Sequence, residues 1–108
     1  PGAHINVGNM YSSQGRGADA EASYQAAIRL DPTFAPAYVN LADLKSRSGE
    51  NAVAIAVLGT GLESQRHESA QTAALHHSLG LALIRERNYD EALTQLDLAA
   101  KQAHDDVL

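Results

Sequence analysis

The chain has 108 residues, a length that suits a single domain over residues 1–108. It has no Cys, which excludes disulfides, thiolate metal ligands and Cys nucleophiles, and no apolar run approaches the ~20 residues that cross a bilayer. Eight Lys and Arg against thirteen Asp and Glu give a formal net charge of −5. Nucleic acid and anionic lipid are therefore poor candidates for a partner, because both need clustered cations.

The sequence repeats itself at fixed offsets. An offset of 34 residues aligns the first third of the chain with the second, and an offset of 38 aligns the second with the third. The copies span about residues 1–34, 35–68 and 73–106, and the longer offset indicates a four-residue insertion around residues 63–72. Small residues recur at two equivalent places in every copy: Gly8, Ala42 and Gly80 at the first, and Ala20, Ala54 and Ala92 at the second.

The first copy is predicted to form two helices joined by a turn. Residues 5–11 carry Val7, Met10 and Tyr11 on one helical face, and the Gly-rich run after Gln14 ends this helix. A second, Ala-rich helix spans residues 18–30. It ends before Pro32, because proline cannot continue a helix and also restricts the residue before it.

The second and third copies repeat this plan. Pro36 stands in the first turn of a helix that ends near Gly49, and residues 52–64 form the next helix. Ser69 is a candidate N-cap for a helix that runs to about residue 86. The inner face of the last helix is expected to carry Tyr89, Ala92, Leu93, Leu96 and Ala99. No segment alternates apolar and polar residues for long enough to be a strand, so the predicted fold class is all-α with six helices.

The small residues indicate how the helices pack. Two antiparallel helices approach closely only where neither carries a bulky side chain, and large neighbours such as Tyr24 and Leu58 then fill the space beside the contact. A single helix pair cannot cover its own apolar face, so each pair is expected to stack on the next. The alternative is a general Ala-rich bundle, which would not require small residues at a constant interval.

These positions resemble the pattern of the tetratricopeptide repeat family. The matching residues are Val7, Gly8, Tyr11, Ala20, Tyr24, Ala27 and Pro32, then Tyr38, Leu41, Ala42, Ala54, Leu58 and Gly61, then Leu79, Gly80, Leu83, Ala92, Leu96 and Ala99. The sequence departs from the pattern at His4 and His76, which replace a Trp, at Lys45, and at Arg66, which replaces a Pro. The resemblance implies an α-α superhelix (solenoid) of three helix-turn-helix hairpins, with the first helices lining a concave groove.

The resemblance also implies that the groove binds a protein or peptide. Its lining would include Ile5, Asn6, Asn9, Ser13, Val39, Asn40, Asp43, Arg47, His77, Ser78, Leu81 and Arg85. Asn side chains both donate and accept hydrogen bonds, which suits a peptide backbone, although hydrogen bonding between helices would explain them equally well. Chaperone adaptors of the family clamp a terminal carboxylate with basic residues. Those places hold Ile5, Ala74 and Ser78 here, so chaperone tails are not expected.

No catalytic, cofactor or metal motif is found, and the chain is not expected to be an enzyme. His76 and His77 point about 100° apart on a helix and do not make a zinc pair. His4 and His76 are expected to pack between helices, with His77 facing the groove. Gly15 and Gly17 follow no strand, so they do not suggest a phosphate loop.

A second functional interpretation stays open, in which the repeats are a structural spacer or assembly arm of a larger protein. Residues 74–82 resemble repeats found in bacterial proteins, which favours a bacterial multidomain parent. No additional solvating helix follows the third copy before Leu108. The end formed by the third pair is therefore expected to be partly apolar and to support self-association.

Overall fold

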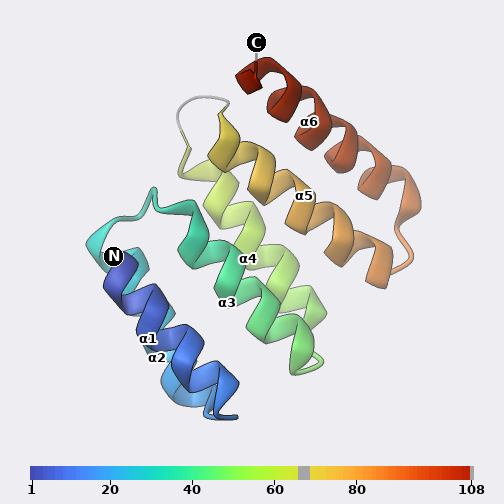
Figure 1. The fold of residues 1–108 in the computed structure, drawn as a ribbon. Helices are drawn as coiled ribbons and strands as arrows, with labels where there is room; N and C mark the ends of the chain where they lie inside the picture. Colours follow the sequence, from blue (N-terminus) through green and yellow to red (C-terminus); the bar gives the residue numbers. More distant parts are fainter. Residues whose placement is uncertain (66–68, 108) are drawn as a thin grey trace.

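The computed structural model describes the backbone of residues 1–65 and 69–107, and the side chains in these ranges as far as residue 102. Its helices are α1 (Gly2–Ser13), α2 (Gly17–Leu30), α3 (Ala35–Arg47), α4 (Asn51–Glu63), α5 (Ala70–Arg85) and α6 (Tyr89–Val107). They form three hairpins that stack in chain order, with α1 and α6 in opposite end hairpins (Figure 1). The described residues contain no strand, so the predicted all-α helical solenoid is confirmed.

Each hairpin turns in the same way at the end of its first helix. The backbone N–H groups of Arg16, Glu50 and Asn88 donate to carbonyls five residues earlier, at 2.9, 2.8 and 2.9 Å. The residue before each donor has a positive φ: 75° at Gly15, 84° at Gly49 and 60° at Arg87. These positions are separated by the offsets of 34 and 38 residues. Glycine adopts this conformation freely, whereas Arg87 holds it at a steric cost.

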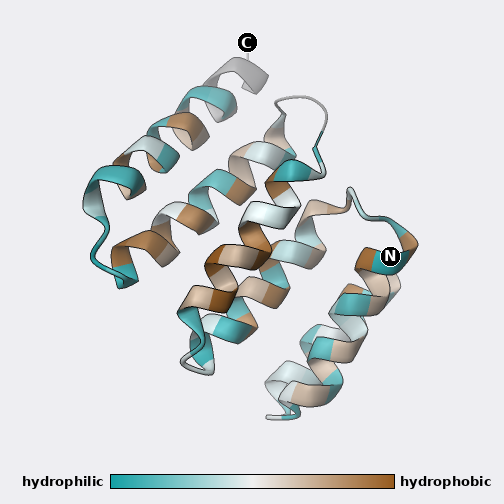
Figure 2. Cartoon of the chain, turned by 180° about the vertical axis from the view of Figure 1, so that it is seen from behind, coloured by the Kyte–Doolittle hydropathy of each residue, from teal (hydrophilic) through white to brown (hydrophobic). Residues whose placement is uncertain are grey.

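The helices of a hairpin approach closely at glycine. A Cβ atom placed on Gly8 would lie 2.5 Å from Cε1 of Tyr24, and one on Gly80 would lie 2.8 Å from Cδ2 of Leu96. Ala20 and Ala54 are fully buried. The hydrophobic colouring is strongest in the middle of the array (Figure 2), where one buried cluster joins α3, α4, α5 and α6.

The predicted N-cap and two of the histidines are placed by the structure. Ser69 is the N-cap of α5, as predicted: its hydroxyl accepts from the backbone N–H of Gln71, and its own N–H donates to the Thr72 hydroxyl. His76 is buried, with Nδ1 2.6 Å from Oε1 of Gln95, while His4 is half-buried. Arg66 and His67, and with them part of the expected insertion, lie outside the described residues.

Two sequence expectations differ from the structure at the ends of the array. Val7 and Met10 are 39% and 49% exposed, because α1 packs on α2 through the side that carries Ile5 and Gly8. The expected inner face of the last helix is wrong for Tyr89 and Leu93, which are 57% and 60% exposed, whereas Ala92 and Ala99 are buried. The two differences have the same cause: within the described residues α6 packs only on α5, and α1 packs only on α2 and α3.

None of the helices in the described ranges combines the length and the apolar character that a membrane span requires.

Candidate functional site

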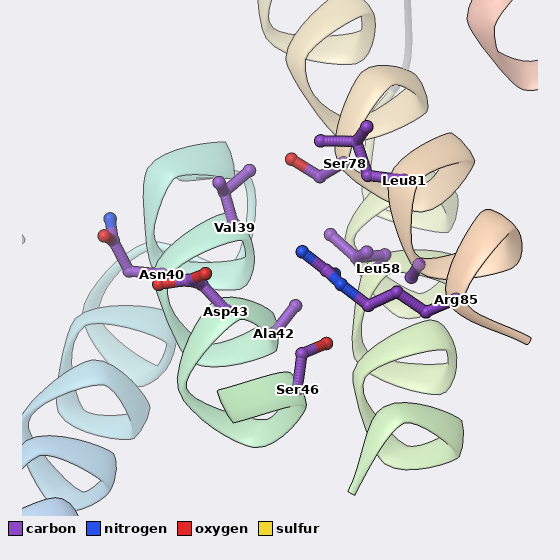
Figure 3. Close-up of a pocket in the computed structure, with 10 residues that line it drawn as sticks. Val39, Asn40, Ala42, Asp43, Ser46, Leu58, Ser78, Leu81 and Arg85 are labelled. Carbon is purple, nitrogen blue, oxygen red and sulfur yellow. The ribbon is translucent and has the colours of Figure 1, made fainter. Parts of the chain in front are cut away.

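A cavity of about 250 Å³ opens between α3 and α5, with Leu58 of α4 beneath it. Figure 3 shows its lining side chains converging from the three helices. Six of the residues that the family resemblance placed in the groove meet here: Val39, Asn40, Asp43, Ser78, Leu81 and Arg85. The remaining lining residues are Ala42, Ser46, Leu58 and Ala82.

Two charged side chains line the cavity: Arg85, which is unpaired within the described residues, and Asp43, which forms an ion pair. The Arg85 side chain extends from α5 across the opening towards α3 (Figure 3). Among the described residues its guanidinium has neither an ion-pair partner nor a hydrogen-bond acceptor. The carboxylate of Asp43 lies 2.7 Å from Nη2 of Arg47, one helical turn further along α3. Arg85 is therefore available to an incoming acceptor, while Asp43 is already partly neutralised.

A hydrogen-bond bridge fixes the lower end of this cavity. The Ser46 hydroxyl donates to Oδ1 of Asn51 at 2.8 Å. The Asn51 amide donates in turn to the carbonyl oxygen of Ala82 at 2.8 Å and to Oε1 of Glu86 at 3.0 Å. Because this bridge joins α3, α4 and α5, it holds the two walls at a set separation.

A second cavity of about 320 Å³ continues along the same two helices towards their N-terminal ends. Its lining is mostly apolar: Ala35, Pro36, Val39, Asn40, Ala70, Gln71 and Ala74. Val39 and Asn40 belong to both cavities, so together they form one continuous depression, which we call the α3–α5 groove.

Asn40 lies where the two cavities join. Its amide donates to the carbonyl oxygen of Pro36 at 2.7 Å. Its Oδ1 atom accepts no hydrogen bond from the part of the chain that the structure describes. The groove thus presents a free acceptor at its middle and a free cation at one end, where the lining is mixed, while the lining of the other end is mostly apolar.

The other predicted lining residues lie elsewhere. Asn9 accepts a hydrogen bond from the Tyr24 hydroxyl at 2.5 Å, so helix–helix hydrogen bonding describes this residue. Burial raises the pKa of Tyr24, which keeps the hydroxyl protonated as the donor. Arg47 reaches α1, where its guanidinium donates to the Ser12 hydroxyl at 3.3 Å. Asn6 and His77 are exposed and line neither cavity.

The sequence expectation omitted two polar groove residues, Ser46 and Gln71. Gln71 precedes Ser78 by seven residues, and residues 71, 74, 78, 81 and 85 follow the three-and-four spacing of one helical face. That spacing could have identified Gln71. No such spacing identifies Ser46, whose side-chain position depends on its hydrogen bond to Asn51.

No group of three or more His, Asp or Glu residues within the described ranges could hold a metal ion. The polar groups that line the groove are the Arg85 guanidinium, the Asp43 carboxylate, the amides of Asn40 and Gln71 and the hydroxyls of Ser46 and Ser78.

A family model for the tetratricopeptide repeat matches residues 11–79, and the chain belongs to this family. Proteins of the family are generally protein–protein interaction modules and are typically scaffolds without enzymatic activity. The chain is also similar to a solved structure, the crystal structure of MamA, with a TM-score of 0.79 and 22% sequence identity. That similarity covers 95% of this chain and 58% of the MamA chain, and at this identity it concerns the fold alone. No curated protein sequence matches the chain.

Proposed function

We propose that the chain is a non-catalytic binding module whose α3–α5 groove holds an extended peptide segment of a partner protein. The observation that supports this proposal is the side chain of Arg85, which crosses the groove with no partner among the described residues. The Arg85 guanidinium is exposed, so an incoming carboxylate or carbonyl oxygen reaches it without first displacing an ion-pair partner within the described residues.

The groove chemistry suggests what the peptide contains. The Arg85 guanidinium suits an acidic side chain or a terminal carboxylate, which it can bind with two parallel hydrogen bonds. The free Oδ1 atom of Asn40 suits a backbone N–H. The side chains of Val39, Leu81 and Ala74 favour small apolar residues beside these polar contacts. A protein partner also fits the net charge of −5 better than nucleic acid or an anionic membrane.

The second candidate function is that of an assembly arm in a larger protein. The exposed side chains of Tyr89 and Leu93 at the C-terminal end of the array favour it. The two functions use different surfaces, because neither of these residues lines the α3–α5 groove.

Selection from a displayed peptide library tests the groove directly. The enriched peptides would be synthesised, and their affinities measured by fluorescence anisotropy for the wild type and for the double variant Asn40→Ala, Arg85→Ala. Losing a hydrogen bond to a charged group costs about 1.5–3 kcal/mol. We therefore expect the double variant to bind about tenfold to a hundredfold more weakly.

A matched control removes the same kinds of group from another surface. Gln25→Ala with Arg29→Ala takes an amide and a guanidinium from exposed positions on α2, outside both cavities. This variant should bind the selected peptides as the wild type does. If the groove variant also keeps full affinity, or if no peptide is enriched, the proposed function is wrong.

A further inference from the structure

Both ends of the array expose apolar side chains. On α1, a helix without Asp, Glu, Lys or Arg, the exposed residues Ala3, Val7 and Met10 form what we call the α1 face. At the other end, Ile84, Tyr89 and Leu93 are 40%, 57% and 60% exposed and form the α6 face. The α6 face borders a cavity of about 260 Å³ whose lining is completed by Ala92 and Leu96.

The α1 face corresponds to a surface that is buried in both other copies. Moving the α1 face forward by 34 residues gives Ala37, Leu41 and Leu44, which are 0%, 5% and 9% exposed and share a cluster with residues of α2. A further 38 residues give Leu75, Leu79 and Ala82, which share a cluster with residues of α4. In each case a first helix lays these three residues near the second helix of the preceding hairpin.

Two residues of the α6 face, Tyr89 and Leu93, correspond in the same way to residues of α4, the helix on which α5 packs. Tyr89 is equivalent to Asn51, whose amide contacts the backbone of Ala82. Ala82 is itself equivalent to Met10 of the α1 face. The repeat therefore pairs Tyr89 with Met10, an aromatic ring with a thioether.

A second pair of equivalent positions gives the same register. Between α2 and α3, the carboxylate of Glu21 pairs with the ammonium group of Lys45. The equivalent residues between α4 and α5 are Ile55 and Leu83: Leu83 belongs to the buried cluster of α3 to α6, and Ile55 packs against that cluster. Between α6 and a following α1 the equivalents would be Leu93 and Tyr11. The two positions match chemically at each junction: charged with charged, or apolar with apolar.

We propose that the chain associates head to tail, with the α1 face of a second copy packing on the α6 face of the first as α3 packs on α2 and α5 on α4. Two observations identify the partner as a second copy of the chain. The contact would continue the two interfaces between hairpins inside the chain, and it would pair Tyr89 with Met10 and Leu93 with Tyr11. This contact uses two different surfaces and leaves a free face at each end, so it builds open assemblies rather than closed dimers. Its affinity is modest, because association between molecules costs translational and rotational freedom that a covalently linked hairpin does not lose.

Sedimentation equilibrium measures the assembly, using single charges placed on each face. Val7→Glu blocks the α1 face and Leu93→Glu blocks the α6 face, while Ala22→Glu adds the same charge at an exposed site on α2. At concentrations up to about 1 mM, we expect the mass of the wild type and of Ala22→Glu to rise beyond that of a dimer. Each blocked variant alone should stay monomeric, with the circular dichroism of the folded wild type.

Mixing the two blocked variants provides the decisive measurement. Each keeps the face that the other lacks, so an equimolar mixture should form one-to-one dimers and stop there. The proposal is overturned if the wild type stays monomeric, if the mixture stays monomeric, or if Val7→Glu alone still dimerises. The variant Asn40→Ala, Arg85→Ala should assemble as the wild type does, which separates this result from that of the peptide experiment.

Discussion

Two glycines in α4 allow the close packing of the array to be tested with one chemical change. Gly59 and Gly61 both lie inside the helix, two residues apart. A Cβ atom on Gly59 would meet nothing within 4 Å. A Cβ atom on Gly61 would lie 2.8 Å from Cγ and 3.0 Å from Cβ of Tyr38, and 3.1 Å from Cδ2 of Leu75. Substitution by Ala should therefore have opposite effects at the two positions.

The magnitudes follow from helix propensity and from overpacking. Gly→Ala inside a helix contributes about 1 kcal/mol of stability, so Gly59→Ala should raise the melting temperature by about 4–8 °C. At Gly61 this gain is opposed by an overpacking cost of about 1–3 kcal/mol. Tyr38 has little freedom to move, because the contact includes its own Cβ atom and its hydroxyl donates to the carbonyl oxygen of Pro32 at 2.6 Å. We therefore expect Gly61→Ala to be less stable than the wild type, by up to about 2 kcal/mol.

Thermal and urea denaturation followed by circular dichroism at the helix band would measure both variants. The difference in stability between the two variants, about 1–3 kcal/mol, is the informative quantity, because the change in composition is identical and only the overpacking cost differs. Equal stabilisation by Gly59→Ala and Gly61→Ala would show that α4 does not approach α3 and α5 as closely as described, and would refute the packing argument.

Three further predictions concern single positions. Ala54→Leu should destabilise the array by about 1–3 kcal/mol, because Ala54 is fully buried; an unchanged melting temperature would contradict its place at a close contact. Arg87→Gly should stabilise the fold by about 1 kcal/mol, since Arg87 has a φ of 60°; calorimetry showing a loss of stability would argue against the left-handed turn. Hydrogen bonds from the Thr33 hydroxyl and backbone N–H hold the pKa of Asp31 below its usual 3.8. The ionised form is thus favoured by folding, and its contribution is present above that value and lost as pH falls through the lowered pKa. The stability difference between wild type and Asp31→Asn should shrink below about pH 4, and a constant difference would be inconsistent with this bond.

Recurring small residues allowed the fold to be predicted, whereas the orientation of the end helices depended on more than periodicity. Apolar spacing shows that Val7, Met10, Tyr89 and Leu93 lie on helical faces, but it does not show whether a neighbour covers that face. In the middle of the array the equivalents of Val7 and Met10, Leu41 and Leu44, are buried, because helices on both sides pack against α3.

The groove residues that follow one helical face could be predicted from the sequence. Residues whose side chains bond to a partner far away in the sequence could not. Val39, Asn40, Leu81 and Arg85 lie in the groove because first helices of neighbouring hairpins run side by side. Asn9 occupies the equivalent place on α1, yet its amide oxygen accepts from Tyr24, fifteen residues away. The positive φ of Arg87 was likewise hidden, since its equivalents are glycines and the sequence gives no sign that Arg adopts their conformation.

The hairpins touch only their immediate neighbours: among the described residues, α1 and α2 make no contact with α5 or α6. Opening an end hairpin therefore breaks one junction, while opening the middle hairpin breaks two. The amide hydrogens of α3 and α4 should consequently exchange with solvent most slowly, and the outer helices should fray first. One wall of the groove is α3, in the slowest-opening hairpin, and the other is α5, in an end hairpin. A peptide bound to both walls would therefore slow the opening of α5.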